Sequence, residues 1–293
     1  MAESERSPLA EEIGSDRRGK GPLLSDLISS LRREGEVLVS AAERGRLDAQ
    51  VPTCPGWLVR DLVHHTGGTH LWAAAHLIQQ RQAQLDPEET EALTAPRPTD
   101  DLLPAWYRAA HRAVVDALEQ ASPRLSCWTF LPAPSPLVFW ARRQAHETEI
   151  HRADAEVASG GITPIPAALA LDGIEEMLFG FAARPRRLAV DQPRRLQLTA
   201  SDSPGEWLVE IGPSGVKASR GGATASDCQV LDSASNLFLL LWNRRLGEGP
   251  EVSGDRDLIE LWRQSIRVRW AERPPQEPRR PVGSDQAAGA PES

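Results

Sequence analysis

The spacing of apolar residues changes only once along this chain, near residue 184, and that change limits the folds available to it. Between residues 23 and 184 apolar side chains recur every three or four positions, which is the spacing of one face of an α-helix. After residue 185 the spacing turns toward two, which is typical of short strands. The pattern therefore predicts an α+β chain with two domains, a four-helix bundle at 23–184 and a small α+β domain at 185–270.

Turn-forming residues divide the two domains into elements. In the first domain we expect one helix from residue 23 and further helices at about 57–84, 101–121, 136–159 and 166–182. In the second we expect strands at 196–201, 206–212 and 215–219, followed by helices at 233–245 and 255–266. The two ends, 1–22 and 271–293, are polar and rich in Pro, Gly or charge, so we expect both to be disordered.

Charge and cysteine content exclude several classes of protein. The formal net charge of −8 argues against a broad basic surface for nucleic acid. Three cysteines with no C-x-x-C pair form no disulfide framework, and a reducing cytoplasm fits them best. The first residues lack the apolar segment of a signal peptide, and the longest strongly apolar run, LFLLLW at 237–242, is too short to span a membrane. We therefore expect a cytoplasmic protein that binds neither nucleic acid nor a membrane.

The segment QAHETEIHRADAE at 144–156 carries an unusual density of groups that can bind metal. It resembles the zinc-protease pattern H-E-x-x-H, but its second histidine comes one residue late. Glu147 and His151 are four residues apart and share a helix face, whereas His146 and His151 lie roughly 140° apart around the helix. The pair that could bind one ion is therefore Glu147 with His151.

A third donor comes from the helix predicted at 57–84. Helical spacing places His65 on the same apolar line as Leu62 and Trp72, so it faces the interior of the bundle. Two imidazoles and one carboxylate, with a fourth position open, form the ligand set of a catalytic zinc site. The alternative is that these are ordinary structural or exposed side chains. A structural or surface role is what we expect for the remaining histidines, namely His64, His70, His76, His111 and His146. For Cys54 we expect a small buried residue in a turn.

Two segments resemble the mycothiol-dependent maleylpyruvate isomerase family. They are VPTCPGWLVRDLVHHTGGTHLW at 51–72 and ARRQAHETEIHRADAE at 141–156, and they are similar to its N-terminal domain, a DinB-like four-helix bundle that binds metal. A third segment, LFLLLWNRRLGEGPEVSGDRDLIELW at 237–262, looks like the family's C-terminal domain. The resemblance implies that the divalent metal, most simply zinc, is held by His65, Glu147 and His151.

The same resemblance implies the chemistry. Mycothiol would be the thiol cosubstrate, and its metal-activated thiolate would add to a small electrophilic carboxylic acid and bring about cis–trans isomerisation. Arg244, or the adjacent Arg245, would hold the substrate carboxylate, although Asn243 replaces the family's usual glycine before it. Asp154 either orients a ligand or is a surface acid at the helix end. The alternatives are a mycothiol S-transferase and a metal-binding or ligand-sensing protein without turnover.

Overall fold

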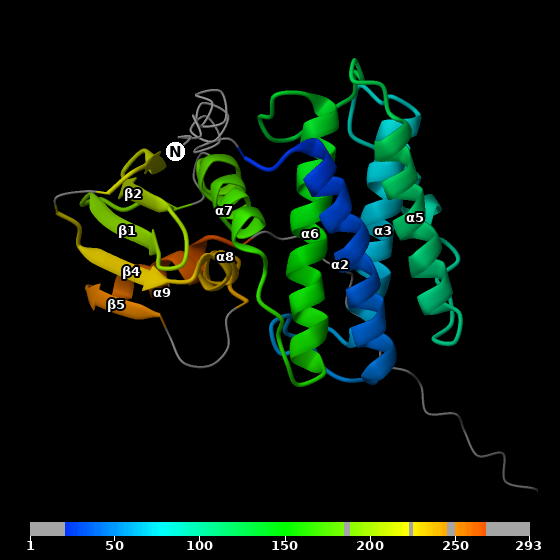
Figure 1. Cartoon of the computed structure of the whole chain (residues 1–293), viewed down its shortest axis with the longest axis horizontal. Coiled ribbons are helices and arrows are strands. Elements are labelled where there is room, and N and C mark those ends of the chain that lie inside the picture. Colours follow the sequence, from blue (N-terminus) through cyan, green and yellow to red (C-terminus); the bar gives the residue numbers. More distant parts are fainter. Residues whose placement is uncertain (1–20, 185–187, 223–224, 245–249, 268–293) are drawn as a thin grey trace, which may run out of the picture.

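The computed structural model describes residues 21–184, 188–222, 225–244 and 250–267. Its first half is a bundle of four long helices, α2 (Leu24–Arg44), α3 (Val59–Ile78), α5 (Leu103–Gln120) and α6 (Pro136–Ala158). A short helix, α4 (Pro87–Thr94), lies in the connection between α3 and α5. Its second half is a sheet with helices between the sheet and the bundle (Figure 1). The predicted fold class, a helical bundle followed by an α+β region, is confirmed.

Helix α6 lies between the other helices of the bundle and the second half of the chain. The side chain of Ser135 caps its first turn by accepting a hydrogen bond from Val138 N at 3.2 Å, and Pro136 suits the first helical position. It ends just before Gly160, whose φ of +92° continues no helix. Helices α2 and α3 pack on one side of α6, while α7 (Ala167–Glu175) and the π-helical turn η1 (Glu176–Ala182) lie on the other. As a result most polar side chains of α6 are buried.

The sheet has the strand order β3-β2-β1-β4-β5. Its strands are β1 (Arg194–Ala200), β2 (Glu206–Gly212), β3 (Gly215–Arg220), β4 (Cys228–Asp232) and β5 (Glu251–Gly254). All neighbours are antiparallel except β1 and β4, which are parallel. In β2 the residues Trp207, Val209 and Ile211 are buried and alternate with exposed or partly exposed ones, so one face of the sheet supports the core.

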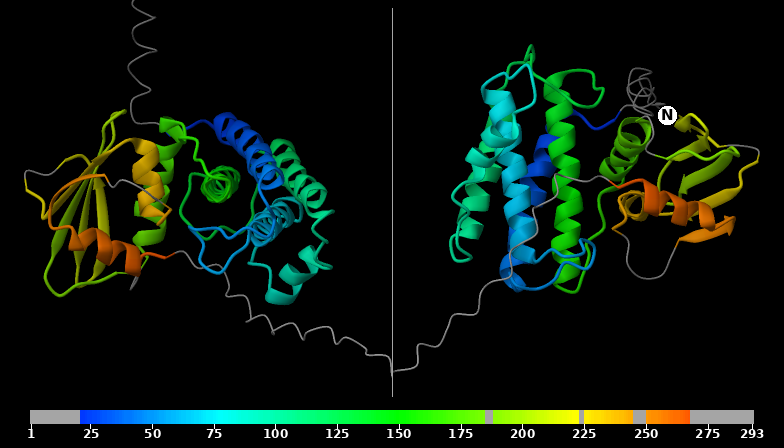
Figure 2. Two further views of the ribbon diagram at one scale, coloured as in Figure 1. Left: turned by 90° about the horizontal axis from the view of Figure 1, so that it is seen from below. Right: turned by 180° about the vertical axis from the view of Figure 1, so that it is seen from behind.

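The two halves share one continuous apolar core. Helices α7 and α8 (Ala234–Leu241) lie between the sheet and the bundle, as two views show (Figures 1 and 2). The cluster of buried apolar side chains runs from Leu31 in α2 through Trp140 in α6 to Leu198 in β1 and Trp262 in α9 (Asp257–Ser265). A shared core of this kind fixes α8, and the residues that follow it, relative to α6.

The structure corrects several element boundaries. The helix predicted at 57–84 ends at Ile78, because Gln80 adopts a left-handed backbone conformation with φ of +48°. Helix α4 was not predicted, although Asp86 caps it and Glu89 completes a capping box. Strands β4 and β5 were also missed, because their place depends on pairing within the sheet, β4 with β1 and β5 with β4. The disorder predicted for 1–22 and 271–293 falls almost entirely outside the described residues.

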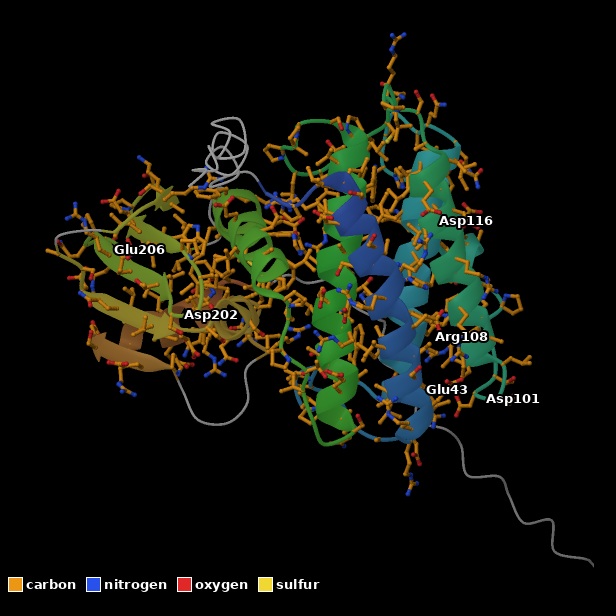
Figure 3. The ribbon with its side chains drawn as sticks, in the orientation of Figure 1. Glu43, Asp101, Arg108, Asp116, Asp202 and Glu206 are labelled. Atoms are coloured by element: carbon orange, nitrogen blue, oxygen red, sulfur yellow. The ribbon has the colours of Figure 1, made fainter. Side chains whose placement is uncertain are left out.

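Charged side chains cover the outside of the bundle, in contrast to the buried ones of α6. Arg108 makes two hydrogen bonds to Glu43 on the outer surface, at 2.8 and 2.7 Å (Figure 3). In the half of the molecule that contains the sheet, Asp202 accepts a hydrogen bond from Ala234 N at the start of α8 (Figure 3). No helix within the described residues is both long and apolar enough to cross a membrane.

Candidate functional site

The three predicted metal ligands meet inside the bundle. Glu147 Oε1 lies 3.1 Å from His151 Nε2 and 3.4 Å from His65 Nε2. All three donor atoms lie within 4.8 Å of one another. Ligands that share one tetrahedral zinc ion at about 2.0–2.1 Å are separated by about 3.3 Å, so the observed spacings fit such an ion. Helices α3 and α6 bring the three residues together, as the helical spacing predicted.

Burial differs among the three donors in a way that suits a site with one open side. Glu147 and His151 are almost completely buried, whereas 17 % of the His65 side chain is exposed. The indole of Trp57, in the loop before α3, lies 4.9 Å from the ring of His65 and 6.5 Å from that of His151. An apolar aromatic ring therefore lies beside the two imidazoles.

Asp154 lies one turn beyond His151 and joins four parts of the site. Its carboxylate accepts hydrogen bonds from the hydroxyl of Thr53 at 2.5 Å and the thiol of Cys54 at 3.3 Å. His151 Nδ1 lies 2.9 Å from Asp154 Oδ2, a distance at which the ring nitrogen donates to the carboxylate. This contact directs Nε2 of His151 toward Glu147. Asp154 is fully buried, so of its two predicted roles the geometry favours the one that orients a ligand.

Arg244 reaches this cluster from the segment after α8. Its Nε donates to Asp154 at 3.1 Å, its Nη1 donates to the carbonyl of Trp242 at 3.0 Å, and its Nη2 lies 3.4 Å from Cys54 Sγ. The preceding residue, Asn243, has a φ of +60°, a conformation that glycine adopts freely and asparagine tolerates. Asn243 therefore adopts a backbone turn, after which the side chain of Arg244 reaches Asp154 and Cys54. Arg245, the alternative arginine, lies outside the described residues.

The electrostatics of the site follow from burial and charge. Burial lowers the pKa of His65. Burial also opposes the charged form of His151, but Glu147 and Asp154 outweigh it and raise the pKa of His151 to about 9. Burial opposes the charge of Glu147 too, yet His151, His65 and Arg143 together hold its pKa well below the usual value. The two carboxylates thus favour a cation on His151, which is either a proton or a metal ion.

A second group of potential ligands shares His151 with the first. Cys54, Asp154 and Nδ1 of His151 have donor atoms within 4.8 Å of one another. In this group, however, the guanidinium of Arg244 already contacts both Cys54 and Asp154. Burial and the charge of Asp154 raise the pKa of the Cys54 thiol to about 12, so it stays protonated. Arg244 is the cation of this second group, and the thiol of Cys54 is a poor nucleophile there.

The other histidines lie away from the three donors. Nε2 of His146 lies 2.7 Å from Asp172 Oδ2 in α7, and His111 Nε2 donates to the carbonyl of Leu31 at 2.9 Å. His70 Nδ1 lies 2.9 Å from Gln144 Oε1, and burial lowers the pKa of His70 to about 3. These contacts are structural. They agree with the prediction that His146, despite its place beside Glu147, is no ligand.

Besides Thr53, sequence reasoning missed Arg143 and Glu176 at the site. Arg143 Nη2 donates to Glu147 Oε2 at 2.8 Å, and its Nη1 donates to Glu176 Oε2 in η1. All three side chains are at most 2 % exposed. The spacing of four between Arg143 and Glu147 is visible in the sequence as a helical ion pair. Glu176 follows 29 residues after Glu147, and no local pattern connects it to the site.

Comparisons with known proteins agree on one family. A family model described as the mycothiol maleylpyruvate isomerase N-terminal domain matches residues 28–156, and one described as the C-terminal domain matches residues 168–261. A solved structure, the crystal structure of the mycothiol-dependent maleylpyruvate isomerase, aligns with a TM-score of 0.57 at 13 % identity, covering 79 % of this chain and 93 % of that one. A histidine-to-alanine mutant of the same enzyme gives the same values. No protein matches in a search of curated sequences.

Proposed function

Because the chain belongs to the mycothiol-dependent maleylpyruvate isomerase family, we propose that it is a mycothiol-dependent metalloenzyme acting on a small electrophilic acid. The observation that carries the proposal is the convergence of His65 Nε2, Glu147 Oε1 and His151 Nε2 in the interior of the bundle. Two imidazoles and one carboxylate suit zinc, and three protein ligands leave a position for a substrate.

The protonation and the hydrogen bonds of the two histidines suit the binding of a divalent ion. Burial keeps His65 neutral, which is the form that binds metal. His151 donates its Nδ1 hydrogen to Asp154 and so offers the Nε2 lone pair once its proton is displaced. When bound, the ion supplies a positive charge that lowers the pKa of an incoming thiol, whose free value is about 8.5 for a cysteine-like thiol.

The reaction needs no group from the protein as nucleophile. A bound thiol would supply the nucleophile: its sulfur would add to one carbon of an electron-poor C=C bond, and the electron pair would move to the adjoining carbonyl. The resulting single bond could rotate, and expulsion of the sulfur would restore the double bond in the trans form and regenerate the thiolate. Cys54, with its raised pKa, does not compete for the electrophile.

Arg244 can bind a substrate without breaking its hydrogen bonds to the protein. Its contacts with Asp154, Trp242 and Cys54 use three of the five N–H groups of a guanidinium. One N–H on each terminal nitrogen remains to donate to a substrate carboxylate. A carboxylic acid is therefore the substrate class that we propose, with Arg244 binding its carboxylate beside the thiol.

The test separates isomerisation from thiol transfer and from metal binding alone. Purified protein loaded with zinc is incubated with mycothiol and a panel of cis-unsaturated acids, with and without a chelator. The proposal predicts isomerised acid, no net loss of thiol, and loss of activity with chelator. Net loss of thiol with formation of an S-conjugate would instead identify a mycothiol S-transferase. Metal binding with neither reaction across the panel would contradict an enzymatic role for these substrates.

A further inference from the structure

The two side-chain oxygens of Glu147 have different partners, and what we infer from this rests on the function proposed above. We propose that Arg143, itself held by Glu176, is a positioning residue that presents Glu147 to the metal through a single oxygen. The inner oxygen, Oε1, faces His65 and His151. The outer oxygen, Oε2, accepts a hydrogen bond from Arg143 Nη2 at 2.8 Å. The two oxygens of one buried carboxylate are thus assigned to different partners.

Contacts on three sides fix the guanidinium of Arg143. Glu176 binds its Nη1, the ring of Phe181 lies 5.3 Å from its central carbon, and the indole of Trp242 lies 5.1 Å from it. Glu176 and Phe181 both belong to η1, a π-helical turn, and such turns are frequent at functional sites. Because Arg143 is 1 % exposed and cannot rotate into solvent, it remains on Oε2 when Oε1 binds a metal.

The number of carboxylate oxygens on the metal decides how many positions are left for other ligands. With two imidazoles and one oxygen, a four-coordinate zinc has one position for a thiol. If both oxygens of Glu147 were available, the carboxylate could chelate and occupy that position. A hydrogen bond from Arg143 to Oε2 opposes chelation by keeping that oxygen engaged. Arg143 therefore limits Glu147 to one metal-binding oxygen and keeps a coordination position open to the thiol.

A purely structural role for Arg143 makes a different prediction. A buried guanidinium between two carboxylates neutralises charge, and its loss would destabilise the fold and weaken metal and thiol binding together. The positioning role predicts that the affinity for metal stays the same or increases, while the affinity for the thiol decreases. The two roles are separated by measuring both affinities on the same variants.

The experiment uses the full chain with cobalt(II) as a spectroscopic probe in place of zinc. The variant Arg143→Met with Glu176→Gln removes the guanidinium without leaving Glu176 as an unpaired charge. We expect its affinity for cobalt to equal or exceed that of the unchanged protein, its visible absorption to decrease as the coordination number rises, and its affinity for mycothiol to fall by about tenfold or more. Arg142→Met is the matched control, because Arg142 on the same helix binds Asp172 and touches no ligand. The control should leave both affinities and the spectrum unchanged.

Glu176→Gln alone provides a second variant that keeps Arg143 and the shape of the site. It loosens one end of the guanidinium, and we expect a smaller change in the same direction. Equal losses of cobalt and mycothiol binding in either variant, or no change in mycothiol binding, would overturn the positioning role. If the double variant does not fold, the single variant decides. If mycothiol leaves the cobalt spectrum of the unchanged protein unaltered, the proposed function fails, and the positioning role with it.

Discussion

Two buried polar clusters on different faces of α6 resemble each other in composition and differ at their centres. The ligand cluster consists of His65, Glu147, His151 and Asp154. The arginine cluster consists of Arg152 with three glutamates, Glu34, Glu149 and Glu156. In the arginine cluster the guanidinium lies 3.1 Å from Glu34 and Glu149 and 2.6 Å from Glu156. Both clusters are almost completely buried, apart from His65, whose side chain is 17 % exposed.

The two clusters differ in the group that lies at the centre. The arginine cluster surrounds a cation that the chain itself supplies, so its carboxylates have their partner at the centre. In the ligand cluster two imidazole nitrogens and one carboxylate oxygen lie within 4.8 Å of one another. The nearby guanidinium groups contact other atoms, Arg143 on Glu147 Oε2 and Arg244 on Asp154. Without a metal these buried donors pair with one another, with the proton of His151 as the cation, and a divalent ion can take the place of that proton. We propose that the arginine cluster stabilises the bundle and that the ligand cluster binds the metal.

The largest expected effect removes one ligand. His151→Ala should weaken zinc binding by more than about 100-fold, because two ligands hold an ion far less tightly than three. His146→Ala, five residues away on another face, should leave zinc binding nearly intact, since His146 binds Asp172. Metal analysis after dialysis, with circular dichroism as the control for folding, checks both. Equal metal loss in two folded variants would disprove the ligand assignment.

A smaller loss is expected when the partner of His151 is changed. Asp154→Asn keeps the shape but removes the charge that orients His151 Nδ1 and binds Arg244. Zinc affinity should fall by about 10–100-fold. Competition with a chromophoric chelator measures it. The matched change in the arginine cluster, Glu156→Gln, should leave zinc affinity unaltered, and a comparable loss there would show that the two clusters are coupled.

The raised pKa of His151 makes zinc binding by the ligand cluster depend on pH. In the metal-free protein His151 carries a proton below its pKa of about 9. Zinc must displace that proton, so binding at pH 7.5 should release close to one proton per ion, and affinity should rise with pH up to about 9. Calorimetry in two buffers of different ionisation enthalpy measures the release. A histidine with an ordinary pKa near 6.5 would release almost none at this pH, and that result would refute the shift.

In the arginine cluster, a change of pH or of a carboxylate should affect the stability of the fold and not zinc binding. Burial, and then the neighbouring charge of Glu34, raise the pKa of Glu149 above its usual value. A raised carboxyl pKa destabilises the fold at pH values above it, and this penalty disappears as the pH falls through it. Glu149→Gln should therefore stabilise the protein at pH 7, with a rise in Tm on the order of 2–4 °C. Thermal unfolding at pH 7 and pH 4 checks this, because the gain should shrink at pH 4. A gain that is constant with pH would contradict the charge explanation.

Local patterns predicted the ligand cluster better than its surroundings. The spacing of four between Glu147 and His151, and the apolar line through His65, could be read from the sequence because a helix converts spacing into direction. The partners of these ligands could not, because they depend on packing between distant segments. Glu176 reaches Arg143 through η1, and Arg244 reaches Asp154 through the turn at Asn243. Strands β4 and β5 were missed for a similar reason, since each is specified by its neighbours in the sheet.

The most direct test of the account is whether metal at His65, Glu147 and His151 ionises a bound thiol. Cobalt-loaded protein at pH 7 is titrated with mycothiol, and the ultraviolet absorption of a metal-bound thiolate is followed, with metal-free protein and the His151→Ala variant in parallel. We expect a saturable thiolate band in the loaded protein and none in the other two, although free mycothiol is mostly protonated at this pH. Absence of the band in fully loaded protein, or an equal band in the His151→Ala variant, would contradict the account.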